Sequence, residues 1–349
     1  KRINHLIRLT CLAGAIFCYS AAGYAEVMSN TALPENGNIV AGGGSIGTTV
    51  NNIMDISGLD NTVIKWDSFN IGSVATVNFS GKDNFNVLNY VASGGSMSQI
   101  HGTMNALNNG NVYLVNPAGV FIGKSAQIDV GSLYVSNKKI KELEDWNGNK
   151  LDKSEDEAKT YINTLWSADD ADQPPKPAEL MSLGHINATS VTFKGDRIVL
   201  DTAYVTKAAD TAIGDENIRI ITNDEDNVVL GYEAYTEDDK TYFGKDKNYK
   251  ITVVGEDGSS SQKDVKGYMW IENVEQLQAM KTNKNGNYAL RNGIDATNTV
   301  ENPFEAITDF SGKLDGLAGN VEGVDFSIFD LHVGSKNAPG SQGLFANTN

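Results

Sequence analysis

Cysteine is nearly absent from this sequence of 349 residues, and the two that it contains, Cys11 and Cys18, both lie close to the N-terminus. The remainder of the chain can form no disulfide bond, even in an oxidising compartment. It also offers no thiolate as a nucleophile or as a metal ligand. Thiol chemistry is therefore excluded for everything beyond the N-terminal segment.

Basic residues and proline are also in short supply. The chain has 28 Lys and Arg residues against 44 Asp and Glu residues, which gives a formal net charge of −16, and it has 7 prolines. A protein that binds nucleic acid needs a basic face to displace counterions from the phosphates, and an anionic bilayer attracts basic segments. The acidic balance argues against both kinds of partner.

Long hydrophobic runs are confined to the first part of the chain. Lys1, Arg2 and Arg8 form a positively charged segment, and the apolar stretch Leu9–Tyr19 follows it. Small residues stand three positions and one position before a cleavage point after Ala25. This arrangement predicts a secretory signal peptide at residues 1–25. The alternative, an uncleaved membrane anchor, is disfavoured because the apolar stretch is shorter than the roughly 20 residues that span a bilayer.

Glycine, with 35 residues, and asparagine are abundant, and they separate short runs in which apolar and polar residues alternate. Such alternation indicates half-buried strands, and Gly and Asn tolerate the positive φ of tight turns. Dense short strands without helices between them are typical of a sandwich, a barrel or a β-solenoid. The clearest runs are Thr62–Trp66, Ala75–Phe79, Asn111–Val115 and Gln127–Val130.

Three adjacent runs, at residues 110–117, 119–123 and 126–131, favour the solenoid. Only short turns separate them, so no crossover helix fits between them. Each coil of roughly 20 residues would stack on the previous coil at about 4.8 Å. We therefore expect a mostly β protein built as a parallel β-helix (β-solenoid) with a continuous apolar core.

The rest of the chain divides into three parts by composition. Residues 138–182 are highly charged with a proline-rich end, which predicts a helical excursion followed by a linker. Strand-like runs return at 183–266, where we expect the β-helix to continue with a hairpin extension. Residues 267–349 form another module, with a short helix expected at Val274–Met280. A solenoid cannot end on an exposed apolar face, so we expect this module to be truncated from a longer protein.

Four motifs in the first part of the chain carry a resemblance to a known family. They are Trp66–Gly72, Val77–Phe79, Asn86–Asn89 and Asn116–Val120. In combination they resemble the secretion domain of the filamentous haemagglutinin family of two-partner-secretion exoproteins, most closely its high-molecular-weight adhesin branch. The resemblance covers residues 30–137 and implies a two-partner-secretion (haemagglutination activity) domain at 26–137.

This resemblance implies a right-handed parallel β-helix with an N-terminal cap and short helical and hairpin excursions. It also implies that an outer-membrane β-barrel transporter with periplasmic docking domains recognises the domain. The protein would then be secreted from a Gram-negative cell, and either released or retained on the outer-membrane surface. Residues 267–349 resemble, less specifically, the Gly-Leu-Phe repeat of long surface adhesins.

The turn at Asn116, Pro117 and Gly119 is the one candidate recognition site that the resemblance suggests. Proline fixes φ at a corner position, glycine permits positive φ, and asparagine can bond to its own backbone or stack on an asparagine of the next coil. These residues therefore either stabilise a turn or contact the transporter directly. Ala118 stands where members of the family usually carry a second asparagine.

The sequence predicts no catalytic, cofactor-binding or metal site. His101, His185 and His332 lack the spacing of metal ligands, and Gly42–Gly47 lacks the Lys-Ser/Thr ending of a phosphate loop. Two acidic clusters lack the spacing of a calcium loop, so they are expected to be solvated. These clusters are Asp224–Asp226 and Glu237–Asp239.

Two alternatives to a non-enzymatic adhesin remain. Parallel β-helices also occur as polysaccharide-degrading enzymes, which need carboxylates converging on one face. Asp196, Arg197 and Asp201 could begin such a site, but strand alternation sends Asp196 and Arg197 to opposite faces. The other alternative is a carrier of a C-terminal contact-dependent toxin. We therefore expect a secreted adhesin that binds an unidentified receptor on a host or bacterial surface.

Overall fold

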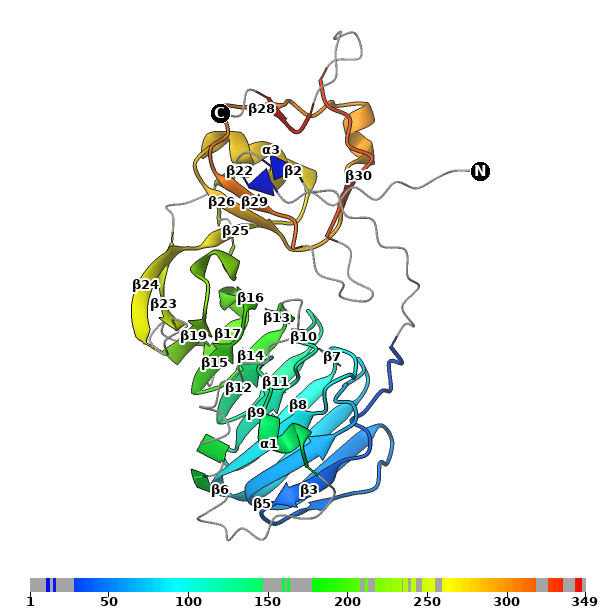
Figure 1. Ribbon diagram of the computed structural model, residues 1–349. Helices are drawn as coiled ribbons and strands as arrows, with labels where there is room; N and C mark the ends of the chain where they lie inside the picture. Colours follow the sequence, from blue (N-terminus) through cyan, green and yellow to red (C-terminus); the bar gives the residue numbers. More distant parts are fainter. Residues whose placement is uncertain are drawn as a thin grey trace. The chain divides into compact units, whose positions relative to one another are not determined.

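The computed structural model (Figure 1) divides the chain into two compact units. The β-helix unit comprises Met28–Val228 and Tyr249–Val265, and the C-terminal unit comprises Val229–Asn248, Lys266–Asn349 and the N-terminal segment. The structure describes residues 11–12, 15–16, 28–146, 159–160, 162–163, 178–207, 211–212, 217–233, 235–237, 240–242, 247–254, 259–317, 326–334 and 343–346.

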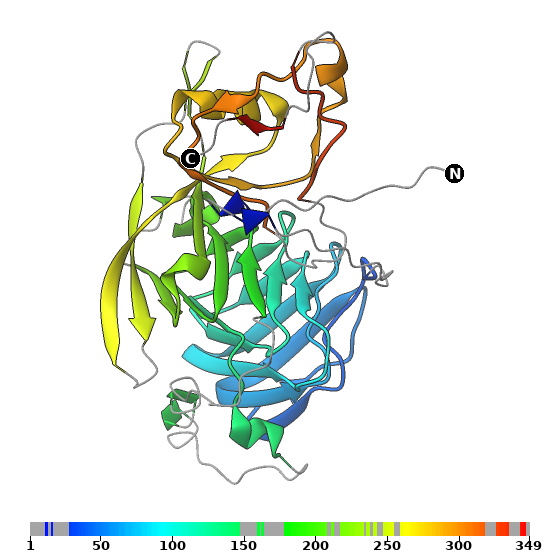
Figure 2. The same cartoon turned by 45° about the horizontal axis from the view of Figure 1, so that its top comes forward.

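The β-helix unit consists of three ladders of mainly parallel strands, stacked one coil on the next (Figures 1 and 2). Ladder one runs through β6 (Thr76–Val91), β8 (Thr103–Ala106), β11 (Gln127–Asp129), β14 (His185–Asn187), β17 (Val205–Lys207) and β18 (Thr211–Ala212). Ladder two shares β6 and continues through β9 (Asn111–Val115), β12 (Ser132–Ser136), β15 (Ser190–Lys194), β19 (Ile218–Thr222), β23 (Asn248–Val254) and β24 (Ser260–Lys266). Ladder three contains β7 (Ser98–Ile100), β10 (Val120–Ile122), β13 (Glu179–Ser182) and β16 (Arg197–Asp201).

The register of the ladders builds the core, because inward side chains of successive coils stack directly on one another. In ladder one, Val77 pairs with Met104, Met104 with Ile128, and Ile128 with Ile186, and all four side chains are buried. Each such aliphatic side chain contributes roughly 1.5–3 kcal/mol by leaving water. Since every coil covers the preceding one, the core is continuous along the axis.

An antiparallel cap covers the first coil. It is formed by β3 (Asn38–Ala41) and β4 (Ser45–Ile46), which both pair antiparallel with β5 (Ile53–Trp66). Strand β5 then pairs in parallel with β6, which begins the ladders. Because the cap occupies the outer edge of the first coil, that edge is not left as an open template for pairing.

Asparagine side chains form ladders of their own on the outside of the strands. The Asn86 amide donates to Asn61 Oδ1 at 2.7 Å, and the Asn111 amide donates to Asn86 Oδ1 at 3.2 Å. On ladder one the Asn78 amide donates to Asp55 and the Asn105 amide donates to Asn78. A parallel in-register stack places identical polar groups at hydrogen-bonding distance, which explains why this residue type is so frequent.

Two details of the expected strand pattern are wrong. β5 and β6 are longer than the runs predicted at Thr62–Trp66 and Ala75–Phe79, because each extends over two faces of the β-helix. The strand alternation assumed for Asp196 and Arg197 does not apply, since Gly195 and Asp196 turn the corner between β15 and β16.

The helical excursion lies partly within the described residues. Its described helix, α1 (Lys141–Glu144), is one turn long, and residues 159–160 and 162–163 are also helical. The remainder of the predicted helix and the proline-rich linker lie outside the described residues. Short 3₁₀ turns, η1 (Thr202–Tyr204) and η3 (Glu225–Asn227), complete the unit.

The C-terminal unit repeats the parallel pattern with shorter strands. Strands β20 (Val228–Tyr232), β25 (Tyr268–Ile271), β26 (Asn287–Leu290) and β29 (Lys313–Asp315) pair in parallel, and so do β27 (Ile294–Asp295) with β30 (Ile328–Phe329) and β28 (Ile307–Thr308) with β31 (Phe345–Ala346). Strands β21 (Tyr235–Glu237) and β22 (Lys240–Tyr242) form an antiparallel hairpin. The unit also contains α3 (Val274–Ala279), η4 (Met280–Thr282) and η5 (Thr297–Val300), while β1 (Cys11–Leu12) pairs antiparallel with β2 (Ala15–Ile16) and with β29.

These features confirm the expected fold class, a mostly β parallel β-helix with an N-terminal cap and short helical and hairpin excursions. Among the described residues, no helix is long and apolar enough to cross a bilayer.

Candidate functional site

The turn at residues 116–119 joins ladder two to ladder three between β9 and β10. The Gly119 amide donates to the Asn116 carbonyl at 2.9 Å, which closes the turn. Asparagine at the first position, proline at the second and glycine at the fourth are the residues that such a turn favours. The turn is nevertheless buried, and only Ala118 is partly exposed.

Every polar atom of the Asn116 side chain is used inside the protein, where this residue is 0 % exposed. Its amide donates to the Ser96 carbonyl and to Ser98 Oγ, both at 3.0 Å. Its Oδ1 accepts from the Ala118 amide at 2.8 Å. The sequence offered two roles for Asn116, a bond to its own backbone or stacking on an asparagine of the next coil, and the structure contains the first. The other two bonds join the turn to the preceding coil.

Gly119 is required at its position by both conformation and space. Its φ is +108°, in the region that favours glycine. A Cβ at this position would lie 2.6 Å from the Glu179 carbonyl oxygen of the next coil. The turn is thus packed against coils on both sides.

The helical excursion leaves and rejoins the β-helix at this same corner between ladders two and three. The Asn137 amide donates to the Ala178 carbonyl at 2.6 Å across the base of the excursion. Lys138 forms an ion pair with Asp196 at 2.5 Å, and both side chains are largely buried. Arg197 pairs with Glu179 at 3.2 Å. The first contact joins the two ends of the excursion, and the two ion pairs fix each end to the corner between β15 and β16, where each buried charge has a partner.

The charged residues considered as a possible enzyme site, Asp196, Arg197 and Asp201, all have partners within the protein. Asp196 and Arg197 each bind a different partner, and Asp201 Oδ1 accepts from the Ala203 amide at 3.1 Å, capping η1. The three residues therefore serve the corners of the β-helix. Within the described segments, no group of three His, Cys, Asp or Glu side chains gathers as metal ligands.

The three histidines considered as metal ligands each have different neighbours. His101 packs edge-on against Phe121, with ring centroids 5.5 Å apart, and burial lowers the pKa of its imidazole. His185 contacts the ring of Tyr204 at 4.3 Å. His332 donates its amide to Thr299 Oγ1 in the C-terminal unit. Each has a local packing environment of its own.

The other candidates from the sequence have simple local roles or lie outside the described residues. Residues 42–44 form the turn between β3 and β4, and Asp224 caps η3 by accepting from the Asp226 amide at 3.0 Å. Asp238 and Asp239, and the predicted cleavage point after Ala25, lie outside the described residues.

Sequence reasoning missed Tyr90, Lys138 and Glu144, which join the excursion to the β-helix. One signal was present. The run Val112–Val115 is apolar at both strand parities, which indicates a strand covered on both faces. Alternation alone had assigned one of those faces to solvent.

Comparison with known proteins identifies the family. A family model described as the TPS secretion domain matches residues 25–230, which is more than half of the chain. The chain belongs to this family. The expected relationship to two-partner-secretion exoproteins is therefore confirmed. The family match extends beyond the stretch in which the sequence motifs were found.

Two curated relatives are similar to part of this chain. Both are heme/hemopexin-binding proteins of Haemophilus influenzae, 36 % identical over 132 residues and 34 % identical over 142 residues. The matches cover 38 % and 40 % of this chain, but only 14 % of each relative.

A solved structure was also matched, the HMW1 secretion domain from Haemophilus influenzae. The sequence identity is 17 % and the TM-score is 0.37, over 75 % of this chain and 73 % of that chain.

Proposed function

We propose that this chain is the export-directing part of a secreted surface adhesin, recognised through its N-terminal domain by a dedicated outer-membrane β-barrel transporter with periplasmic docking domains. The observation that carries the proposal is the match of the TPS secretion domain over residues 25–230. The predicted signal peptide, with cleavage after Ala25, would bring the chain to the periplasm first.

The architecture suits export in an unfolded state followed by folding outside. Each coil pairs with the coil that precedes it, so a chain that emerges N-terminus first can add coils one at a time. Cys11 and Cys18 are the only cysteines, and both fall in the predicted signal peptide. The mature chain would then form no disulfide in the periplasm that could block its passage.

The turn at Asn116, Pro117 and Gly119 enters this proposal in a specific way. Because the Asn116 side chain is fully buried, a partner cannot reach it in the folded domain. We therefore place any contact of this motif with the transporter in the unfolded chain, before the turn closes. After folding, the same residues serve only the β-helix.

The proposed mechanism is structural and involves no catalysis. The carboxylates that could have begun a glycan-degrading site are bound to partners at the corners of the β-helix. The similarity to the two relatives covers only a small part of each of them, so it assigns no ligand to this protein. The adhesin is proposed to bind a receptor on a host or bacterial surface, with a carrier of a C-terminal contact-dependent toxin as the alternative function.

The test is expression with and without the cognate transporter, followed by immunoblotting of periplasm and medium. Transporter-dependent appearance outside the cell is the expected result. Release without any transporter would refute the proposal, and so would retention in the periplasm despite a matched transporter.

Three variants separate recognition from folding in the same assay. Asn116→Ala, Ser98→Ala and Gly119→Ala all weaken the same corner of the β-helix. If the motif is read by the transporter, Asn116→Ala lowers secretion further than Ser98→Ala does at matched stability. If secretion falls in proportion to the loss of stability in all three variants, the transporter does not recognise the motif directly, and the motif has only a structural role.

A further inference from the structure

The outer face of ladder two carries apolar side chains that strand alternation assigns to solvent. Here the outer stripe denotes Val63, Leu88, Tyr90, Tyr113 and Val115. Their neighbours in sequence point inward, yet all five residues are buried. A parallel sheet buried on both faces needs a second layer of structure outside it.

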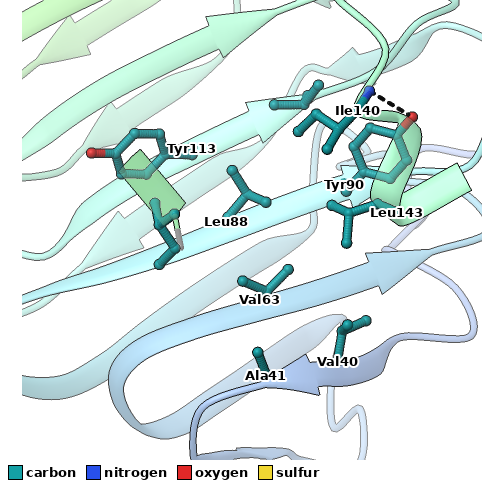
Figure 3. Close-up of a cluster of buried hydrophobic side chains, with 10 residues drawn as sticks. Val40, Ala41, Val63, Leu88, Tyr90, Tyr113, Ile140 and Leu143 are labelled. Carbon is teal, nitrogen blue, oxygen red and sulfur yellow. Dashed lines mark hydrogen bonds between the residues drawn. The ribbon is translucent and has the colours of Figure 1, made fainter. Parts of the chain in front are cut away.

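Segments far apart in the sequence supply that layer. Val40 and Ala41 of β3 cover one end, and Ile140 and Leu143 cover the stripe from the segment that follows β12. Ile162, from the later helical part of the excursion, belongs to the same cluster. Figure 3 shows the side chains of β3 and of the segment after β12 beside those of the stripe. Residues 138–146 are called the strap below. Leu143, at 0 % exposure, is its central apolar contact.

Polar bonds fix the strap over the stripe. The Tyr90 hydroxyl donates to the Glu144 carboxylate, and the Ser93 amide donates to Glu144 Oε1 at 3.0 Å. Lys65 Nζ donates to the Leu143 carbonyl at 2.6 Å, near the C-terminal end of α1. The Ile140 amide approaches the Tyr90 hydroxyl at 3.4 Å, the dashed line in Figure 3.

These bonds join residues that lie far apart along the chain. Glu144 is 54 residues after Tyr90, and Leu143 is 78 residues after Lys65. The strap therefore runs back from the coil that contains β12 to the coils of β9, β6 and β5. It can dock only after those coils have paired, because its binding surface is assembled from all of them.

The strap has little reason to be helical by itself. α1 is a single turn, and its N-cap residue, Ile140, offers no side-chain acceptor. A helix of this length is not stable in water, so its conformation comes from docking. Burial, together with the hydrogen bond to Glu144, raises the pKa of the Tyr90 hydroxyl, which keeps it protonated as a donor.

We propose that the strap is a clasp that closes over the outer stripe once β12 has been added, and that it locks the cap and the first coils of the β-helix. An open strap leaves the stripe in water with the coils still paired. A closed strap ties the cap, β5, β6 and β9 to β12, so that the first coils no longer come apart one at a time.

Cysteine labelling measures the opening of the clasp directly, in a full-length chain that carries Cys11→Ala and Cys18→Ala. Leu143→Cys reports the strap, Val63→Cys reports the stripe beneath it, and Leu114→Cys reports the interior of ladder two. Each variant is mixed with a maleimide under native conditions, and the labelling rate is measured. The clasp predicts equal rates at positions 143 and 63, and a much slower rate at 114.

A second substitution then releases the clasp. Glu144→Ala removes the acceptor of two hydrogen bonds, and about a tenfold increase in the labelling rate is expected at both 143 and 63. The rate at 114 stays unchanged. Glu142→Ala is the matched control, since Glu142 is an exposed glutamate of the same helical turn. It leaves all three rates unchanged.

Two results overturn the proposal. If Val63→Cys stays protected while Leu143→Cys is labelled, the strap does not cover the stripe. If Glu144→Ala increases the labelling rate at position 114 as much as at positions 143 and 63, the labelled state is the globally unfolded protein. If the cysteine variants fail to fold, amide hydrogen exchange is measured instead on the variant that carries Glu144→Ala alone. Faster exchange in β5 and β6, with β9 unchanged, supports the clasp, and a change confined to residues 138–146 refutes it.

Discussion

Replacing Asn116 by alanine tests the structural role of the buried turn. The substitution deletes the bonds to the Ser96 carbonyl, Ser98 Oγ and the Ala118 amide. Ser98 is 1 % exposed, so its hydroxyl loses its partner without gaining water, whereas the exposed Ser96 can be solvated. At roughly 0.5–1.5 kcal/mol for each bond, the expected loss of unfolding free energy is about 2–4 kcal/mol.

Urea unfolding followed by tryptophan fluorescence measures this loss. Trp66, one of four tryptophans, is buried and donates its indole N–H to Asn89 Oδ1 at 3.0 Å, so its contribution to the emission reports the integrity of the first coils. With a urea m-value near 3 kcal/mol/M, the midpoint should fall by about 1 M.

The double variant with Ser98→Ala provides the control. Because Asn116 and Ser98 share one hydrogen bond, the double variant should lose less unfolding free energy than the sum of the losses of the two single variants. A loss below about 0.5 kcal/mol for Asn116→Ala, or strict additivity with Ser98→Ala, would contradict the role derived for this turn.

Three further predictions concern other residues. Gly119→Ala should destabilise the protein by more than about 2 kcal/mol, because it combines a positive φ with a collision against the Glu179 carbonyl; an unchanged melting temperature would contradict this. Burial lowers the pKa of His101 in the folded protein, so the unfolded chain binds the proton first and stability should fall as the pH drops below about 6.5. His101→Gln should flatten that part of the pH profile, and an equally steep profile in the variant would refute the assignment. Mass spectrometry of the exported protein should find Glu26 as the first residue, and any other N-terminus would move the cleavage point away from Ala25.

The sequence determined the local elements of this protein to a large extent. Alternation of apolar and polar residues predicts β11 and the first part of β6, because a strand projects successive side chains to opposite faces. The turn at residues 116–119 was predictable from the residues that it contains. The density of short strands limited the fold to a few architectures, and the family motifs selected the β-helix.

The pairing partners of the strands were harder to predict. β12 pairs with β9 of the preceding coil and with β15, beyond the excursion, where Ser190 Oγ lies 3.0 Å from Ser132 Oγ across 58 residues of sequence. A period-two pattern says which side chains share a face, but it does not say which strand lies alongside. An inward-pointing polar residue such as Asn89 argues against a buried strand when the sequence is considered alone. In the structure its side chain accepts from the Trp66 indole and donates to the Tyr113 carbonyl.

Only the tertiary structure decided what covers each face of the sheets. Tyr90, Leu88 and Val63 lie at positions that alternation gives to solvent, and they are buried because Ile140 and Leu143 return to them from a later part of the chain. The periodicity of a strand fixes the directions of its side chains, because these follow from the geometry of its own backbone. The partner that meets a side chain depends on where distant segments pack, and that is settled only when the whole domain folds.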